Sequence, residues 1–131
     1  MTTVIFACVQ NAGRSQMAAA FFNRMANPEL ACAISAGTRP AREVHREVVD
    51  AMRELGHDLS QARPKLLTPE LARGATWLIT MGCGEECPVI AGVHREDWPL
   101  LDPAELGMPD VRKIRDQIKD RVGSFIAAEG L

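Results

Sequence analysis

The seven residues from Thr3 to Val9 form a continuous apolar run that is rich in β-branched side chains. A strand buried on both faces has this pattern, whereas a half-exposed strand alternates apolar and polar residues. Strands buried on both faces occur almost only in parallel sheets that are covered by helices. The run therefore predicts a parallel sheet in an α/β protein.

Expected strands and helices alternate along the rest of the chain. Helices are expected at about 15–25, 41–55 and 109–127, with a short one after Thr68, and further strands at 31–36, 76–81 and about 97–101. With 131 residues, the chain is long enough for one core but not for two. We expect a single domain over residues 1–131 with three layers: a four-stranded parallel sheet and helices on both faces.

Composition excludes several classes of protein. A net charge of -2 provides no basic surface for nucleic acid or an anionic membrane. No apolar run approaches the roughly 18 residues of a membrane span, and no positive charge precedes the first apolar run as in a secretory signal. We therefore expect a cytoplasmic protein. Its four cysteines are then candidates for packing, metal ligation or redox chemistry rather than for stable bridges.

A polar loop joins the first expected strand to the first helix, and it starts at Cys8. Backbone N–H groups and the helix dipole converge in such a loop and favour a tetrahedral oxyanion. Gly13 is expected to supply a positive φ, and the Arg14 guanidinium can bind the anion with two hydrogen bonds. The same positive field favours a Cys8 thiolate, to which Ser15 can donate. The predicted oxyanion site consists of Gln10, Asn11, Ala12, Gly13, Arg14 and Ser15.

Cys83 and Cys87 follow the third expected strand, at the sheet edge where sites of α/β proteins collect. This segment must curl to bring the two Cα atoms within the about 4.4–6.8 Å that a disulfide needs. Two alternatives remain open from the residues alone: two inert thiols, or a metal site of Cys83, Cys87 and His94 with Asp97 or Cys8 as the fourth ligand. Cys32, inside the second strand, is expected to be a small buried packing residue.

The segment from Cys8 to Ser15, Cys-Val-Gln-Asn-Ala-Gly-Arg-Ser, resembles the Cys-x5-Arg-Ser loop of the low-molecular-weight protein tyrosine phosphatases. It also resembles the loop of the arsenate reductases built on that fold, and the following Gln16-Met17-Ala18 looks more like these reductases. Ser35-Ala36-Gly37 and Asp102-Pro103 are similar to further family motifs. The resemblance covers nearly the whole chain and implies the fold of these phosphatases.

The resemblance also implies a reaction. Cys8 attacks arsenic while Asp102 protonates the departing oxygen, and Cys83 then attacks Cys8 so that arsenite leaves. Cys87 next attacks Cys83, and an outward-facing Cys83–Cys87 disulfide is reduced by thioredoxin. In the family, Asn11 would brace the loop and meet Ser35.

No bound cofactor and no metal are expected, only an external thiol reductant. Mycothiol or another small thiol in place of thioredoxin, and a tyrosine phosphatase activity, are the alternatives within the fold. The chain has no tyrosine to stack a phenol, which favours arsenate and phosphate-like oxyanions over a phosphotyrosyl protein. A phosphocarrier domain, against which Arg14 argues, and an arsenic sensor are alternatives of other classes. We expect a monomer, with a homodimer as the alternative.

Overall fold

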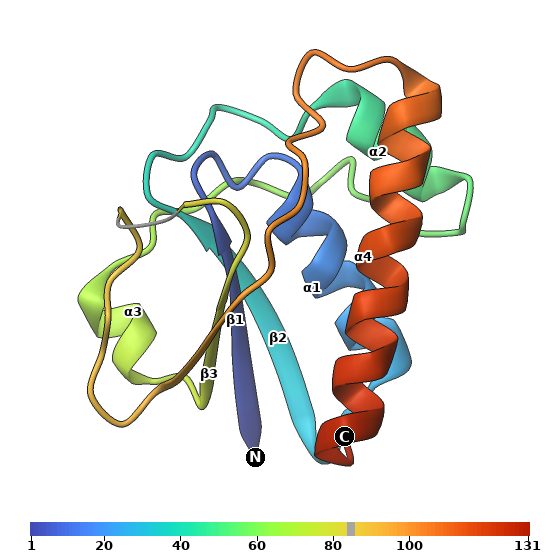
Figure 1. The fold of residues 1–131 in the computed structure, drawn as a ribbon. Coiled ribbons are helices and arrows are strands. Elements are labelled where there is room, and N and C mark those ends of the chain that lie inside the picture. Colours follow the sequence, from blue (N-terminus) through green and yellow to red (C-terminus); the bar gives the residue numbers. More distant parts are fainter. Residues whose placement is uncertain (84–85) are drawn as a thin grey trace.

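The computed structural model describes residues 1–83 and 86–131, and its four strands form one parallel sheet in the order β2-β1-β3-β4 (Figure 1). The strands are β1 (Thr2–Cys8), β2 (Ala31–Gly37), β3 (Trp77–Thr80) and β4 (His94–Asp97). The helices are α1 (Arg14–Met25), α2 (Arg46–Arg53), α3 (Pro69–Arg73) and α4 (Met108–Glu129). The expected α/β class and four-stranded parallel sheet are confirmed.

Helices cover both faces of this sheet, so the three expected layers are confirmed. Val4 and Phe6 of β1 point to the face that packs against α1 and α4, whereas Ile5 and Ala7 point to the face that α3 covers (Figure 1). All four side chains are fully buried. The continuous apolar run of β1 exists because both of its faces lie inside the protein.

Local signals set the start of α3, as expected, and the end of α4. The Thr68 hydroxyl caps α3 by accepting a hydrogen bond from the Leu71 N–H at 3.1 Å, and Pro69 occupies its first turn. Such a cap is worth about 1 kcal/mol. Helix α4 buries one apolar stripe and ends at Glu129, and the following Gly130 has a φ of 68°, the left-handed conformation common after a helix.

The structure corrects two expected boundaries. Helix α2 begins at Arg46 and not near residue 41, because the His45 N–H, which would donate to the Ala41 carbonyl in a longer helix, donates to the Ala12 carbonyl instead. Strand β4 covers 94–97 and not 97–101, because Pro99 has no N–H to donate to a ladder. The β4 residues are polar, since this strand lies at the edge of the sheet.

Cys32 is only half-buried, which corrects the expectation of a packed thiol. Strand β2 is the other edge of the sheet, and its burial alternates along the first four residues, so Cys32 and Ile34 are less covered than Ala31 and Ala33.

The carboxyl ends of β1, β2 and β3 share one edge of the sheet, where the loops that follow these strands come together (Figure 1). The connection from β4 to α4 also crosses this edge, since a Cβ on Gly13 would lie 2.9 Å from Cγ of Pro103. Four segments far apart in the sequence therefore meet there. Over residues 1–83 and 86–131, no helix is long and apolar enough to cross a membrane.

Candidate active site

The loop between β1 and α1 curves so that its carbonyl groups face the chain segment 38–45. Four N–H groups of that segment, from Thr38, Arg39, Ala41 and His45, donate to the carbonyls of Cys8, Val9, Gln10 and Ala12 at 2.8–3.2 Å. Among the described residues, the N–H groups of positions 9–16 donate no hydrogen bond within the protein. Because the carbonyls are engaged outward, these N–H groups are available to an oxyanion at the N-terminus of α1.

The positive backbone angle of this loop belongs to Asn11, whose φ is 51°, and not to Gly13, whose φ is -145°. The expectation that Gly13 supplies the positive φ is therefore wrong. Gly13 is needed for space instead, since a Cβ on it would press on the ring of Pro103. Asparagine tolerates the left-handed region better than most residues because its side chain can bond locally.

Buried hydrogen bonds hold the Cys8 thiol in place. Cys8 Sγ lies 2.8 Å from Ser15 Oγ, and Asn11 Nδ2 donates to that same hydroxyl at 2.7 Å. Since Asn11 is the donor in the second bond, the Ser15 proton is free to point at Sγ when Cys8 is a thiolate. Gln16 Nε2 and the Lys65 N–H both donate to Asn11 Oδ1, at 3.2 and 3.0 Å. The thiol thus has a donor whose direction the loop fixes.

Arg14 is the buried cation of the site. Its Nη1 donates to the Leu100 carbonyl at 3.0 Å, and its Nη2 lies 3.4 Å from Asp102 Oδ2. The other Asp102 oxygen accepts from the Ala104 N–H at 2.9 Å, and the side chain is more than half exposed. The structure therefore brings the expected anion-binding arginine and the expected acid together. The first turn of α1 carries no acidic residue that would weaken its positive field.

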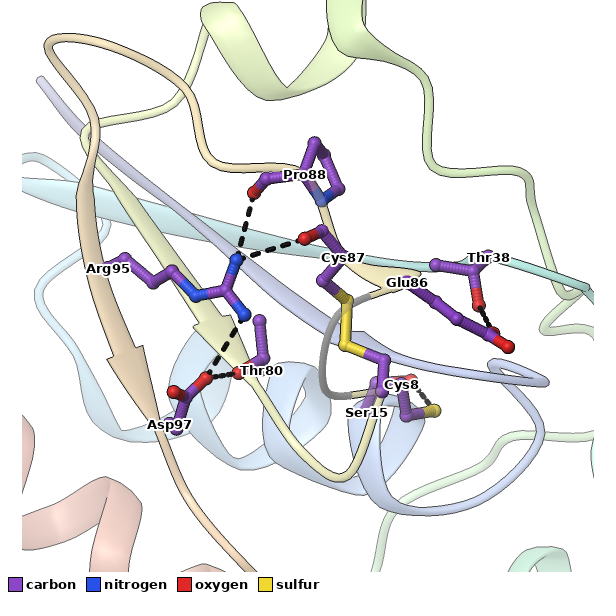
Figure 2. The surroundings of a disulfide bond; sticks show 10 residues. Cys8, Ser15, Thr38, Thr80, Glu86, Cys87, Pro88, Arg95 and Asp97 are labelled. Atoms are coloured by element: carbon purple, nitrogen blue, oxygen red, sulfur yellow. Dashed lines mark hydrogen bonds and ion pairs between the residues drawn. A yellow bond between two sulfur atoms is a disulfide. The ribbon is translucent and has the colours of Figure 1, made fainter.

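Cys83 and Cys87 are joined in a disulfide with Cα atoms 5.7 Å apart, so the segment curls as expected, while Cys8 is a free thiol (Figure 2). The disulfide does not face outward, which corrects that expectation: Cys83 and Cys87 are 5% and 2% exposed and pack in the core beside α3. Arg95 Nη1 donates to the carbonyls of Cys87 and Pro88 at 3.0 and 3.1 Å and holds the segment inward (Figure 2).

This disulfide also bears on the alternative metal site, because it joins two of the four proposed ligands to each other. No group of three or more His, Cys, Asp or Glu side chains arranged for a metal occurs in the part of the chain that the structure describes. Ser35 is buried in β2, and among the residues that the structure describes it does not meet Asn11, whose side chain bonds to Ser15, Gln16 and Lys65.

Sequence reasoning did not find several residues that support the site. Gln16 and Lys65 brace Asn11, the Leu100 carbonyl holds Arg14, and Glu86 anchors the disulfide segment. Lys65, Leu100 and Glu86 act through contacts between positions far apart in the chain, for which no sequence motif exists. Gln16 lies only five residues from Asn11, in the segment that resembles the arsenate reductases, but its bond to Asn11 was not expected. Gly82 also lies close to the site, and a glycine beside Cys83 indicates a tightly turned backbone.

Comparison with known proteins agrees with this geometry. The sequence model of the low molecular weight phosphotyrosine protein phosphatase family matches residues 3–129. A Halobacterium salinarum protein named for arsenate reduction is 40% identical over 121 residues, covering 89% of this chain and 85% of the relative. The glutaredoxin arsenate reductase of a Synechocystis species is 32% identical over 130 residues, covering 97% and 98% of the two chains.

Two solved structures show the same fold. The thioredoxin-dependent arsenate reductase of Corynebacterium glutamicum is 36% identical with a TM-score of 0.81; the match covers 98% of this chain, which spans 60% of that protein. An arsenate reductase in its phosphate-binding state is 30% identical with a TM-score of 0.84, and 98% of each chain is covered. These relatives are arsenate reductases, and the chain therefore belongs to the arsenate reductases of the low molecular weight phosphotyrosine protein phosphatase family.

Proposed function

We propose that this protein reduces arsenate to arsenite with three of its own thiols and is then regenerated by an external thiol reductant. The observation that carries the proposal is that a Cys83–Cys87 disulfide and a free Cys8 thiol follow two neighbouring parallel strands, β3 and β1, at the same edge of the sheet. A phosphatase needs the loop but has no use for a redox pair at the same sheet edge. This arrangement corresponds to the last state of a thiol relay, before the reductant acts.

The first proposed step forms a sulfur–arsenic bond. The Cys8 thiolate, with Ser15 as donor, attacks the arsenic of an arsenate held by the N–H groups of residues 10–15 and by Arg14. One arsenate oxygen departs as water after taking a proton from Asp102, which lies beside Arg14. Arsenic remains As(V) in the adduct, so no electrons have yet moved.

Electrons move in the second step. The Cys83 thiolate attacks Cys8 Sγ, a Cys8–Cys83 disulfide forms, and the electron pair of the broken sulfur–arsenic bond stays on arsenic, which leaves as arsenite, As(III). The Cys87 thiolate then attacks Cys83 Sγ and releases the Cys8 thiolate, which leaves the disulfide seen in the structure. Two thiols have been oxidised for each arsenate reduced.

We propose thioredoxin as the electron donor, as in the Corynebacterium glutamicum relative, whose name states this dependence. A glutaredoxin system, as the Synechocystis relative's name states, or a small thiol such as mycothiol would regenerate the same disulfide. We further propose that residues 1–131 act as one domain and as a monomer in the reducing cytoplasm, where dithiol reductants are maintained. Phosphate would compete with arsenate for the same loop.

The test is an arsenate-dependent oxidation of NADPH by thioredoxin and its reductase. We expect turnover with the wild-type protein and none with Cys8→Ser, Cys83→Ser or Cys87→Ser. Cys32→Ser is the matched control and should retain full turnover, because Cys32 lies half-buried in β2 and has no part in the relay. Without reductant, Cys87→Ser should release one arsenite per protein and accumulate a Cys8–Cys83 disulfide, which peptide mass spectrometry detects.

Two results would overturn the proposal. Full thioredoxin-linked turnover in both Cys83→Ser and Cys87→Ser would show that these two cysteines do not form a relay. Hydrolysis of p-nitrophenyl phosphate without any arsenate reduction would assign the protein to the phosphatases. Running the assay in parallel with glutaredoxin and with mycothiol identifies the reductant.

A further inference from the structure

The Arg14 guanidinium is confined on several sides. It is almost fully buried, the Leu100 carbonyl accepts from its Nη1, and Asp102 lies beside its Nη2. Both partners lie on the connection between β4 and α4. An arginine binds a tetrahedral oxyanion well only when its planar fork is held in the correct direction.

The remaining side of the guanidinium rests on the backbone of Gly82. A Cβ on Gly82 would overlap Nη1 of Arg14 and would lie 3.2 Å from Cζ and 3.4 Å from Nη2. All three nearest atoms belong to Arg14, so the Nη1 end of the guanidinium lies directly against this residue. Any side chain at position 82 would take the place of the guanidinium.

The neighbours of Gly82 in the chain connect it to the anion loop, which is the loop of residues 8–15 between β1 and α1. The N–H of Met81, one residue before Gly82, donates to the carbonyl of Ala7, one residue before Cys8, at 2.7 Å. Cys83, the residue after Gly82, is held in the disulfide. Gly82 therefore lies between Met81, which is hydrogen-bonded to β1, and Cys83, which is held in the disulfide.

We propose that Gly82 is a positioning residue for oxyanion binding. Because Gly82 has no side chain, the Arg14 guanidinium can occupy the position from which it binds the oxyanion. The inference rests on the proposed function, because it concerns the same loop. It assigns to Gly82 a role separate from its turn. Gly82 has a φ of +92°, and Gly92 has a φ of +82°, but a Cβ on Gly92 would meet nothing within 4 Å. Backbone angle is common to both glycines, whereas the contact with arginine belongs to Gly82.

The test compares Gly82→Ala with Gly92→Ala. Both variants place a methyl group at a positive φ, so both carry the same kind of backbone strain. Only the first displaces Arg14. We expect the Kd for inorganic phosphate, measured by isothermal titration calorimetry with the disulfide formed, to rise at least ten-fold in Gly82→Ala and less than two-fold in Gly92→Ala. KM for arsenate should rise in parallel with that Kd.

The same substitutions in an Arg14→Ala background distinguish loss of the contact between residue 82 and Arg14 from a general loss of stability. There the guanidinium is absent, so Gly82→Ala should change phosphate affinity and the midpoint of urea unfolding no more than Gly92→Ala does. If Gly82→Ala fails to fold in the wild-type background but folds with Arg14→Ala, the contact is confirmed. If it fails in both, or if its phosphate affinity equals that of Gly92→Ala, the inference is wrong.

Phosphate binding needs no electron transfer, so this test is independent of the proposed reaction. If Gly82→Ala weakens phosphate binding in a protein that does not reduce arsenate, the role of Gly82 is supported and the proposed reductase activity is wrong. If the protein reduces arsenate but Gly82→Ala binds phosphate as well as the wild type does, the reductase activity is supported and the role of Gly82 is wrong.

Discussion

At the scale of single residues, the site depends on where one hydroxyl proton points. The Ser15 hydroxyl accepts a hydrogen bond from Asn11 and lies 2.8 Å from Cys8 Sγ. Because the amide already supplies the donor to Oγ, the hydroxyl serves as a donor to the thiolate form of Cys8. A hydrogen bond to a charged group is worth about 1.5–3 kcal/mol, more than a neutral one.

Ser15→Ala should therefore make Cys8 a poorer nucleophile. We expect alkylation of Cys8 by iodoacetamide at pH 7 to slow by roughly 10- to 100-fold, the equivalent of losing one such bond. Peptide mass spectrometry follows the reaction after reduction of the protein. Cys32 is an internal control, because it lies half-buried on β2 and should react at an unchanged rate. Equal slowing of both thiols, or of neither, would contradict this role of Ser15.

The sequence was sufficient to predict which side chains this loop brings together, but not its backbone. The spacing of Cys8, Arg14 and Ser15 after a buried strand was sufficient to predict a thiol and an arginine at a helix N-terminus. It also indicated that one residue needs a positive φ, and Gly13 was the natural choice. Which residue takes that angle depends on the segment 38–45 and on Pro103, contacts that lie outside the motif.

At the scale of elements, the buried disulfide segment is tied to the rest of the protein at two places. Glu86 accepts hydrogen bonds from Thr38 Oγ1 at 3.1 Å and from Arg39 Nη2 at 2.8 Å, just after β2. From β4, Arg95 donates to the carbonyls of Cys87 and Pro88 (Figure 2). Since thiol–disulfide exchange needs an accessible sulfur, the segment must open before a reductant can act.

Glu86→Gln should speed reduction of the disulfide by weakening one of these ties. The Arg39–Glu86 ion pair is exposed, and such pairs contribute about 0–1 kcal/mol, so we expect an increase of roughly two- to five-fold in the rate with dithiothreitol. Added salt should increase the rate of disulfide reduction more in the wild-type protein than in the variant, because salt screens the Arg39–Glu86 ion pair. Labelling of Cys83 and Cys87 thiols measures the rate.

Glu70→Gln provides the control for that experiment, since it removes another exposed ion pair, with Arg73 on α3. Its reduction rate should equal that of the wild type. The idea that opening of the segment limits reduction fails if Glu86→Gln and Glu70→Gln are indistinguishable at low salt.

Elements were predictable from sequence where burial alone determines them. The apolar runs of β1 and β3 and the apolar stripe of α4 required no knowledge of their neighbours. Strand β4 is His-Arg-Glu-Asp, and only its pairing with β3 makes it a strand. The start of α2 depends in the same way on hydrogen bonds between segment 38–45 and the anion loop. The inward-facing disulfide depends on Arg95, from another strand.

For the whole molecule, one charge cluster joins α2 to α4 at a distance from the site. Glu54, at the end of α2, accepts hydrogen bonds from Arg112 and Arg115 of α4, each with a shortest distance of 2.8 Å. Arg115 is buried and also donates to the Ala51 carbonyl. The N-terminus of α2 follows directly on the segment that supports the anion loop, so this cluster helps to fix that support.

The cluster makes stability depend on pH in a predictable direction. Hydrogen bonds from Arg112 and then Arg115 lower the pKa of the Glu54 carboxyl from 4.5 to about 2. A group whose pKa falls on folding stabilises the folded state fully above its unfolded pKa and loses that contribution as pH falls toward its folded pKa. The contribution of Glu54 should therefore be complete above pH 4.5 and disappear near pH 2.

Glu54→Gln isolates this contribution from that of the other carboxylates. We expect the variant to unfold at lower urea concentration than the wild type at pH 7, and the difference in unfolding free energy to narrow steadily between pH 4.5 and pH 2. Glu29→Gln is the control, because Glu29 has no ion pair among the described residues, so at pH 7 this variant should unfold at the same urea concentration as the wild type. A difference for Glu54→Gln that is the same at pH 7 and at pH 2.5 would show that the charge of Glu54 is not what joins α2 to α4.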